Sequence, residues 1–234
     1  MKTDSTEYSG LLNLMTWLSP SFPVGGYVFS HGIEFAVEDG RVIDEKGLCI
    51  WVNAALCQGA GRIDGALFIA AWQATMESDF DRLKWAVERA DVMRGTFELA
   101  LESAAQGRAF LDTVLQTWES TKLKKVADVV NSMDRSLTYA IAVAIVSAAA
   151  GITLRSALLA YYHAFSANLV SAGVRLVPLG QISGQRCIAA LKVSVKETTE
   201  AALDGHYDEL GTTAPVIDLV SMKHETQYTR LFRS

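Results

Sequence analysis

No proline occurs between Pro23 and Pro178, an interval that makes up most of this 234-residue chain. Proline removes a backbone donor and breaks helices, so its absence leaves the interval free to be helical. Apolar residues recur there at three- and four-residue steps, and strong period-two alternation is missing. These patterns predict an all-α fold, a single-domain helical bundle with a helix-prone C-terminal tail.

Segments with helical periodicity follow one another along the chain, separated by glycine, proline or capping residues. They cover residues 8–18, 28–39, 44–58, 64–77, 80–89, 92–118, 121–132, 137–150, 153–171 and 181–203. Asp44, Ser78 or Asp79, and Asp134 are expected to cap the helices that follow them. We expect one domain over residues 1–234, with a helical core at 7–209 and a linker and partner-binding tail at 210–234.

Two of the predicted helices indicate which side chains face the core. In the first helix the inward stripe is Leu11, Leu14, Met15 and Leu18. In the helix at 92–118 the inward positions are Met93, Phe97, Leu101, Ala104, Leu111 and Leu115, and the outward ones are Arg94, Glu98, Glu102 and Asp112. Helical bundles often bury such a stripe against a second copy, so we expect a homodimer.

A rigid corner is predicted at residues 18–34, LSPSFPVGGYVFSHGIE. Pro20 and Pro23 restrict the backbone, and the Gly25–Gly26 pair permits positive φ. His31 and Glu34 follow three residues apart, which on a helix places them on one face. The corner therefore presents aromatic and polar side chains in a fixed turn.

Charge and cysteine usage narrow the class of protein. The net charge of -5 and a pI near 5.4 argue against nucleic-acid binding, which requires a basic surplus. Cys49, Cys57 and Cys187 form no disulfide framework and no CxxC pair, so we expect a reducing, cytoplasmic setting. Cys49 and Cys57 are expected to pack as small hydrophobes. The N-terminus lacks signal-peptide features, and residues 137–150 are too short to span a bilayer, which predicts no membrane contact.

Residue chemistry predicts neither an enzyme nor a bound cofactor. Gly25–Gly26 lacks the lysine of a phosphate-binding loop, and Ser30, His31 and Glu34 on one turn cannot form a nucleophilic triad. His31 is expected to be a capping or interface histidine. The histidines, His31, His163, His206 and His224, match no metal-ligand spacing, and Glu98 and Glu102 are expected on solvated faces.

The chain's end has the composition of a binding segment. It combines charge with aromatic and apolar side chains: His224, Glu225, Tyr228, Arg230, Leu231 and Phe232. Arginine, tyrosine and phenylalanine are typical interface anchors, and a terminal segment can order when a partner arrives. The alternative to partner binding, given equal weight, is a frayed end or a helix docked on its own chain.

The corner resembles the signature of the UreF family of urease accessory proteins, whose usual form reads close to WLSPSFPVGGFSYSHGLE. Trp17 supplies the leading tryptophan. Three further stretches agree with the family: residues 94–110 (RGTFELALESAAQGRAF), residues 166–186 (SANLVSAGVRLVPLGQISGQR) and the end HETQYTRLFRS. Together with the corner, these stretches are spread along the chain from near its N-terminus to its C-terminal end.

The resemblance implies an all-α, dimeric, non-catalytic chaperone component that acts in nickel delivery. Members of the family bind the accessory protein UreD, also called UreH, and the complex recruits the GTPase UreG and docks on apo-urease. The resemblance assigns the UreD-binding tail to His224, Glu225, Tyr228, Arg230, Leu231 and Phe232. It assigns the dimer seam or UreG-facing side to Gly25, Gly26, Tyr27, His31 and Glu34.

The sequence departs from the family pattern at three positions. Val28 and Phe29 replace a serine and a tyrosine, and Ser183 replaces an aspartate. Two alternative functions stay open: a regulator of GTP hydrolysis by UreG that supplies Arg94 or Arg230 as an arginine finger, and a helical scaffold unrelated to nickel. The sequence leaves open whether nickel contacts the chain.

Overall fold

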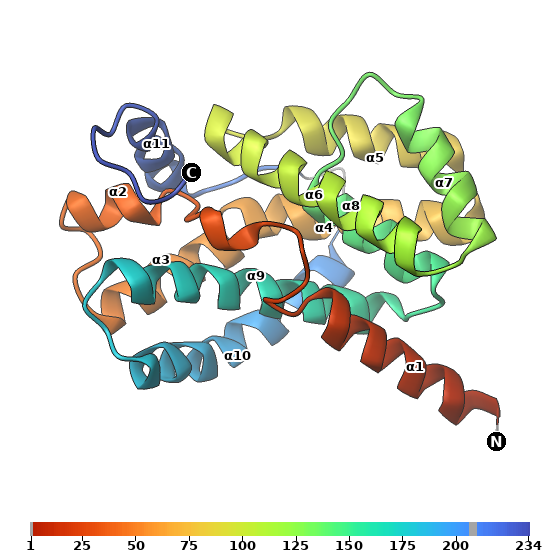
Figure 1. The fold of residues 1–234 in the computed structure, drawn as a ribbon, viewed down its shortest axis with the longest axis horizontal. Helices are drawn as coiled ribbons and strands as arrows, with labels where there is room; N and C mark the ends of the chain where they lie inside the picture. Colours follow the sequence, from red (N-terminus) through yellow and green to blue (C-terminus); the bar gives the residue numbers. More distant parts are fainter. Residues whose placement is uncertain (1, 206–209) are drawn as a thin grey trace.

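The computed structural model describes residues 2–205 and 210–234, with side chains from residue 8 onward. All regular elements of the described residues are helical, which confirms the all-α prediction (Figure 1). The helices are α1 (Lys2–Trp17), η1 (Gly26–Val28), α2 (Ile33–Glu38), α3 (Glu45–Cys57), α4 (Ala60–Glu77), α5 (Phe80–Val92), α6 (Phe97–Thr117), α7 (Thr121–Asn131), α8 (Tyr139–Ala149), α9 (Leu154–Leu176), α10 (Gln181–Asp204) and α11 (Pro215–His224). The predicted boundary between residues 209 and 210 adjoins residues 206–209, which lie outside the described part.

Two apolar clusters form the interior. The first surrounds α8, whose residues from Ala140 to Ala148 are all buried, and α4 and α6 pack against it. The second lies between α3, α9 and α10 and is closed by α2 and α11. Figure 1 shows α2, α3 and α11 at one end of the molecule and α5 and α7 at the other. Because α9 contributes Tyr161 to the first cluster and Leu169 to the second, it joins the two.

Local capping explains several helix starts. The carboxylates of Asp44 and Asp79 accept from the backbone N–H groups of Gly47 and Arg82, at 2.7 and 3.0 Å, as predicted. The prediction for Asp134 is wrong, because α8 begins five residues later and Thr138 occupies its N-cap position. Residues 92–118 are not one helix either.

The helix α6 begins at Phe97 and not at residue 92. Thr96 is its N-cap, and its hydroxyl accepts from the Leu99 N–H at 3.1 Å. Phe97, expected to face inward, is 73% exposed. The periodicity of the sequence runs through this break, so it could not locate the capping threonine.

The first helix buries only part of its expected stripe. Leu14 is buried and Leu18 is partly buried against the first cluster, whereas Leu11 and Met15 are 55% and 65% exposed. The prediction for Leu11 and Met15 is therefore wrong within this chain.

None of the described helices combines the length and the apolar character that crossing a membrane requires.

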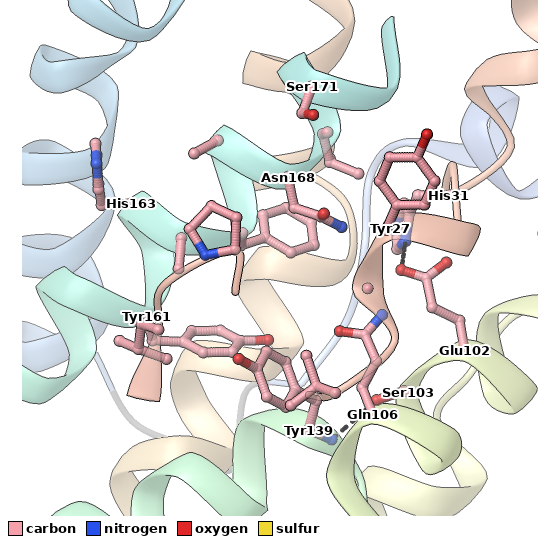
Figure 2. Close-up of a pocket in the computed structure, with 18 of the residues that line it drawn as sticks. Tyr27, His31, Glu102, Ser103, Gln106, Tyr139, Tyr161, His163, Asn168 and Ser171 are labelled. Carbon is pink, nitrogen blue, oxygen red and sulfur yellow. Dashed lines mark hydrogen bonds and ion pairs between the residues drawn. The ribbon is translucent and has the colours of Figure 1, made fainter. Parts of the chain in front are cut away.

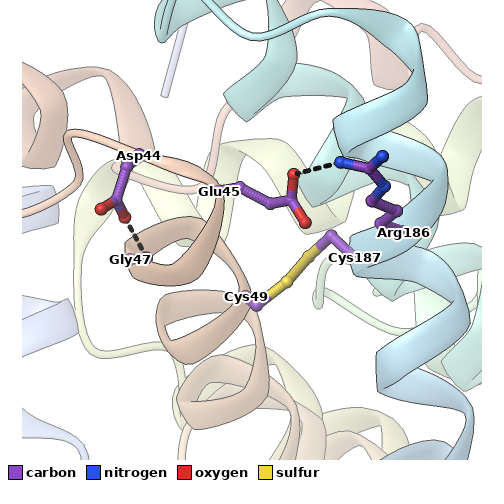
Figure 3. The surroundings of a disulfide bond; sticks show 6 residues. All are labelled: Asp44, Glu45, Gly47, Cys49, Arg186 and Cys187. Carbon is purple, nitrogen blue, oxygen red and sulfur yellow. Dashed lines mark hydrogen bonds and ion pairs between the residues drawn. A yellow bond between two sulfur atoms is a disulfide. The ribbon is translucent and has the colours of Figure 1, made fainter.

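A disulfide joins Cys49 in α3 to Cys187 in α10 (Figure 3). Their Cα atoms lie 5.5 Å apart, a usual separation for bonded cysteines. The expectation that Cys49 packs as a lone hydrophobe is wrong, because packing of α3 on α10 brings together two residues 138 positions apart. Cys57 is free, and the reducing, cytoplasmic setting stays a prediction.

Candidate functional site

The corner at residues 18–34 turns the chain between α1 and α2 with left-handed backbone conformations. Gly25 and Gly32 have φ of 72° and 78°, and His31 has φ of 57°. α2 begins only at Ile33, so the prediction that His31 and Glu34 share a helical face is wrong. A side chain at Gly32 would bring a Cβ within 3.2 Å of the Ser221 Cα, so glycine at this position allows α11 to lie against the corner.

The terminal segment, residues 225–234, runs back along the corner. The Ser30 N–H and hydroxyl both donate to the Ser234 carbonyl, the N–H at 2.8 Å. The Arg233 N–H donates to the Val28 carbonyl, also at 2.8 Å. Of the alternatives for this end, the structure shows docking on the chain itself. The two candidate regions of the sequence therefore form one continuous site.

Glu34 holds the terminal segment by its backbone. Its Oε1 accepts from the Leu231 N–H at 2.7 Å, and its Oε2 accepts from the Phe232 N–H at 2.9 Å. Oε2 also lies 3.0 Å from Nε2 of His224. Glu34 is 6% exposed, so water cannot replace these donors without opening the site.

His224, at the end of α11, is fully buried between two carboxylates. Its Nε2 faces Glu34, and its Nδ1 lies 2.6 Å from Oε2 of Glu98. Each ring nitrogen of His224 therefore has a carboxylate oxygen as its partner. The second oxygen of Glu98 accepts from Arg230 at 2.7 Å, so α6, α11 and the terminal segment meet at this carboxylate.

Glu102 forms the third buried carboxylate, one helical turn after Glu98. One of its oxygens accepts from the Ser234 hydroxyl at 2.6 Å, and the other lies 3.4 Å from Nδ1 of His31. Burial opposes the charge of Glu102, but His31, the Ser234 hydroxyl and Arg94 outweigh it and hold the pKa of Glu102 below its usual value. The prediction that Glu98 and Glu102 are solvated is wrong, since they are 3% and 7% exposed.

An aromatic and cationic stack lies beside the carboxylates. The Arg175 guanidinium lies 3.9 Å from the Tyr27 ring centroid and 4.4 Å from that of Phe232. It also donates to the Tyr27 carbonyl at 2.8 Å. Phe232 is buried and Tyr27 is 70% exposed. Arg175 therefore joins an anchored residue of the terminal segment to an exposed residue of the corner.

The predicted site residues thus divide by exposure. Gly25 and Gly26 shape the turn, and Tyr27, Tyr228 and Leu231 point outward, with Tyr228 fully exposed. Glu225 is exposed just after α11, and Arg230 keeps 39% of its side chain accessible. The buried group is His31, Glu34, His224 and Phe232. The exposed residues present a surface, and the buried residues fix its shape.

A cavity of about 380 Å³ lies under the corner, between α6 and α9 (Figure 2). Its wall includes Arg94, whose side chain is 7% exposed and donates to Asp64 at 2.6 Å. Tyr161 donates to the other oxygen of Asp64 at 2.6 Å, and burial together with this carboxylate raises the pKa of Tyr161. The prediction that Arg94 faces outward is wrong, and the guanidinium of Arg94 cannot extend to a partner.

The chemistry of this wall is largely satisfied within the chain. His31 lies beside the cavity next to Glu102, and its buried Nε2 has no hydrogen-bond partner among the described residues. Within residues 2–205 and 210–234, no group of three His, Cys, Asp or Glu side chains could hold a metal ion. His206, one of the histidines considered from the sequence, lies outside the described residues.

Sequence reasoning missed Arg175, Ser234 and the roles of Glu98 and Glu102. The four-residue spacing of the two glutamates predicted a shared face of α6 and could have indicated a pair of acceptors. No local pattern indicates Arg175, because its partners come from the corner and from the terminal segment.

Two of the positions that depart from the family pattern lie in the corner. Val28 is 38% exposed and Phe29 is buried, so the phenylalanine serves as a core residue.

Comparison with known proteins identifies the family. A model of the UreF family matches residues 42–192 of the chain. The chain belongs to the UreF family. A relative from Granulibacter bethesdensis, named urease accessory protein UreF, is 44% identical over 232 residues, covering 99% of this chain and 97% of its own length.

Two further relatives carry the same name. One from Rhodopseudomonas palustris (strain BisB5) is 44% identical over 228 residues, and one from Bradyrhizobium sp. (strain BTAi1) is 43% identical over 228 residues. Each covers 97% of this chain and 93% of its own length. The corner and the terminal segment lie outside residues 42–192, but nearly full-length similarity to UreF proteins extends to both ends of the chain.

Replacement of Glu34 by glutamine tests how the terminal segment is held. Glu34→Gln removes the charge that faces His224 and one of the acceptors for two backbone N–H groups, so we expect it to lower the free energy of unfolding by about 3 kcal/mol. Urea denaturation followed by circular dichroism measures the loss. The matched control Glu225→Gln, on an exposed glutamate, should stay within about 0.5 kcal/mol of the parent chain. Equal stability of both variants would contradict this account.

The depressed pKa of Glu102 predicts a pH dependence. Because the folded-state pKa lies below the unfolded one, the ionised carboxylate stabilises the fold above the usual value of about 4.3, and this stability is lost as the pH falls through the folded pKa. Urea titrations of the parent chain and Glu102→Gln at several pH values should show a stability difference that shrinks on acidification. A difference that is constant with pH would show that the charge of Glu102 contributes nothing.

Proposed function

We propose that this chain is a urease accessory protein that assists urease maturation by incorporation of the nickel metallocentre. Membership of the UreF family and full-length similarity to proteins named urease accessory protein UreF support this assignment. We propose a non-catalytic, cytoplasmic chaperone component that acts as a homodimer. Nickel is the cargo of the assembly, and we assign no residue of this chain to it.

The proposed partners are UreD/UreH, the GTPase UreG and apo-urease. The observation that carries this proposal is the preformed surface where the terminal segment lies on the corner. Phe232 and the backbone of Leu231 are fixed by buried groups, while the side chains of Tyr228 and Leu231 remain 103% and 77% exposed. A surface held in shape before binding loses little conformational entropy when a partner docks. We assign it to UreD/UreH.

The corner side of the same surface is proposed for UreG or the dimer seam. Tyr27 is exposed there, and Arg175 and the Pro-Gly turn hold it in place. The alternative is that this chain supplies an arginine finger to UreG. Arg94 is unsuited to that role because it is buried against Asp64. Arg230 is also bound within the chain, because it donates to the buried Glu98. No observation favours this alternative over the accessory role.

Urease activation in a strain lacking this chain tests the proposed function. The parent chain should restore urease activity, and Tyr228→Ala combined with Leu231→Ala should reduce both activity and co-purification with UreD. These side chains are exposed, so the fold should keep its stability. Deletion of the whole terminal segment is a poorer test, because it would also remove the Leu231 N–H from the buried Glu34 and the Arg230 guanidinium from the buried Glu98.

The matched control is Ile182→Ala, which removes a side chain of similar exposure, 71%, from α10. It should behave like the parent chain in both assays. Full co-purification of the double variant would contradict the assignment of the terminal segment to UreD. Full urease activity without any copy of this chain would contradict the accessory function itself.

A further inference from the structure

The two cysteines of the disulfide differ in their access to solvent. Cys187 is fully buried, whereas Cys49 is only partly buried. Glu45 and Arg186 bridge the same two helices beside the disulfide, with 3.9 Å between Oε2 of Glu45 and Nη1 of Arg186 (Figure 3). A reagent in solution can therefore reach the sulfur of Cys49 more readily than that of Cys187.

Noncovalent packing also holds α3 and α10 together. A Cβ at Gly173 in α9 would lie 2.2 Å from Cδ1 of Leu48, the α3 residue next to Cys49. A Cβ at Gly184 in α10 would lie 2.8 Å from Cγ2 of Val174 in α9. The three helices thus approach one another closely and share the second apolar cluster. Reduction of the disulfide would therefore leave the two sulfur atoms as neighbours.

The compartment decides what such a pair of cysteines can do. Glutathione keeps thiols reduced in the cytosol, and the disulfides found there are usually transient or redox-sensing. Two cysteines that packing keeps adjacent in a reducing compartment can pass between the dithiol and the disulfide without unfolding of the chain. A permanent structural disulfide is instead typical of oxidising compartments.

We propose that Cys49 and Cys187 form a reversible thiol–disulfide switch, which links α10 covalently to α3 under oxidising conditions and releases it under reducing ones. The inference rests on the cytoplasmic setting of the proposed function. Gln185 and Ile188 lie on either side of Cys187 along α10 and line the cavity under the corner. The switch therefore changes how firmly one wall of this cavity is held.

Oxidation by glutathione disulfide, a low-molecular-weight disulfide, proceeds in two exchange steps. The Cys49 thiolate attacks one sulfur of glutathione disulfide, so that a mixed disulfide forms at Cys49 and one glutathione thiolate leaves. The Cys187 thiolate then attacks the Cys49 sulfur, forms the bond between the two cysteines and releases the second glutathione. Two electrons pass from the cysteines to glutathione disulfide, and the two cysteine protons end on the released thiols. Reduction by glutathione runs these steps backwards and begins at Cys49.

A glutathione titration of the isolated parent chain tests the switch. The chain is equilibrated at ratios that range from fully reduced to fully oxidised glutathione, and free thiols are alkylated in denaturant and located by mass spectrometry. Cys49 and Cys187 should change together from alkylated to bonded across the series, while Cys57, which is free, should join neither of them. A pair that stays bonded at the most reducing ratio, as structural disulfides do, would overturn the proposal. A pair that never closes at the most oxidising ratio would overturn it as well.

Oxidation should also change the stability of the chain and the motion of α10. A disulfide between residues 138 positions apart restricts the unfolded chain, so the oxidised chain should unfold at a higher urea concentration than the reduced chain. Hydrogen exchange of the amides of residues 181–188 should be slower in the oxidised chain. Equal urea midpoints and equal exchange in both states would overturn a covalent link that holds the cavity wall.

Two serine variants separate the switch from other effects of the buffer. Cys49→Ser removes the link, so its urea midpoint should be the same in oxidised and reduced glutathione. The matched control Cys57→Ser removes a thiol about two turns further along α3 and should keep the difference. A difference that persists in Cys49→Ser would overturn the proposal. Urease activation by the parent chain is measured separately, so failure of the switch is distinguishable from failure of the accessory function.

Discussion

The placement of the terminal segment depends on three carboxylates buried side by side. Glu34, Glu98 and Glu102 would repel one another and lose hydration unless every oxygen found a donor. Their partners come from outside their own helices. These partners are two backbone N–H groups of the terminal segment, both ring nitrogens of His224, the Arg230 guanidinium, the Ser234 hydroxyl and Nδ1 of His31. Docking of α11 and the terminal segment thus supplies most of the partners of these buried carboxylates, and the segment is part of the fold.

The surface that we propose for a partner follows from this condition. Gly32 permits the close approach of α11 to the corner, and α11 in turn carries His224 between Glu34 and Glu98. Once the backbone beyond His224 is fixed, the side chains of Tyr228 and Leu231 are directed to solvent with little freedom left in the main chain. In the accessory role proposed above, such preorganisation would raise the affinity for a partner.

The fold class was predictable from the sequence, because helical periodicity and the absence of proline are local properties. For the same reason the sequence predicted the capping roles of Asp44 and Asp79 and the burial of residues 140–148.

The site was predictable as two separate segments and not as one site, because the contact between the segments joins residues about two hundred positions apart. The burial of Glu98 and Glu102 contradicts their chemistry in isolation. It is made possible by partners from other segments, which are His224, Arg230, Ser234 and His31. The Cys49–Cys187 disulfide likewise depends on the packing of α3 against α10.

Hydrogen exchange of the backbone amides of Leu231 and Phe232, measured on the isolated chain, tests the central claim most directly. Both amides donate to a buried carboxylate in the absence of any partner. The account predicts that they exchange far more slowly than the amide of the exposed Thr229 between Tyr228 and Arg230, with protection approaching that of the helices around them. Exchange of both amides at the rate of an unstructured peptide would show that the terminal segment is free, and would contradict a preformed partner surface.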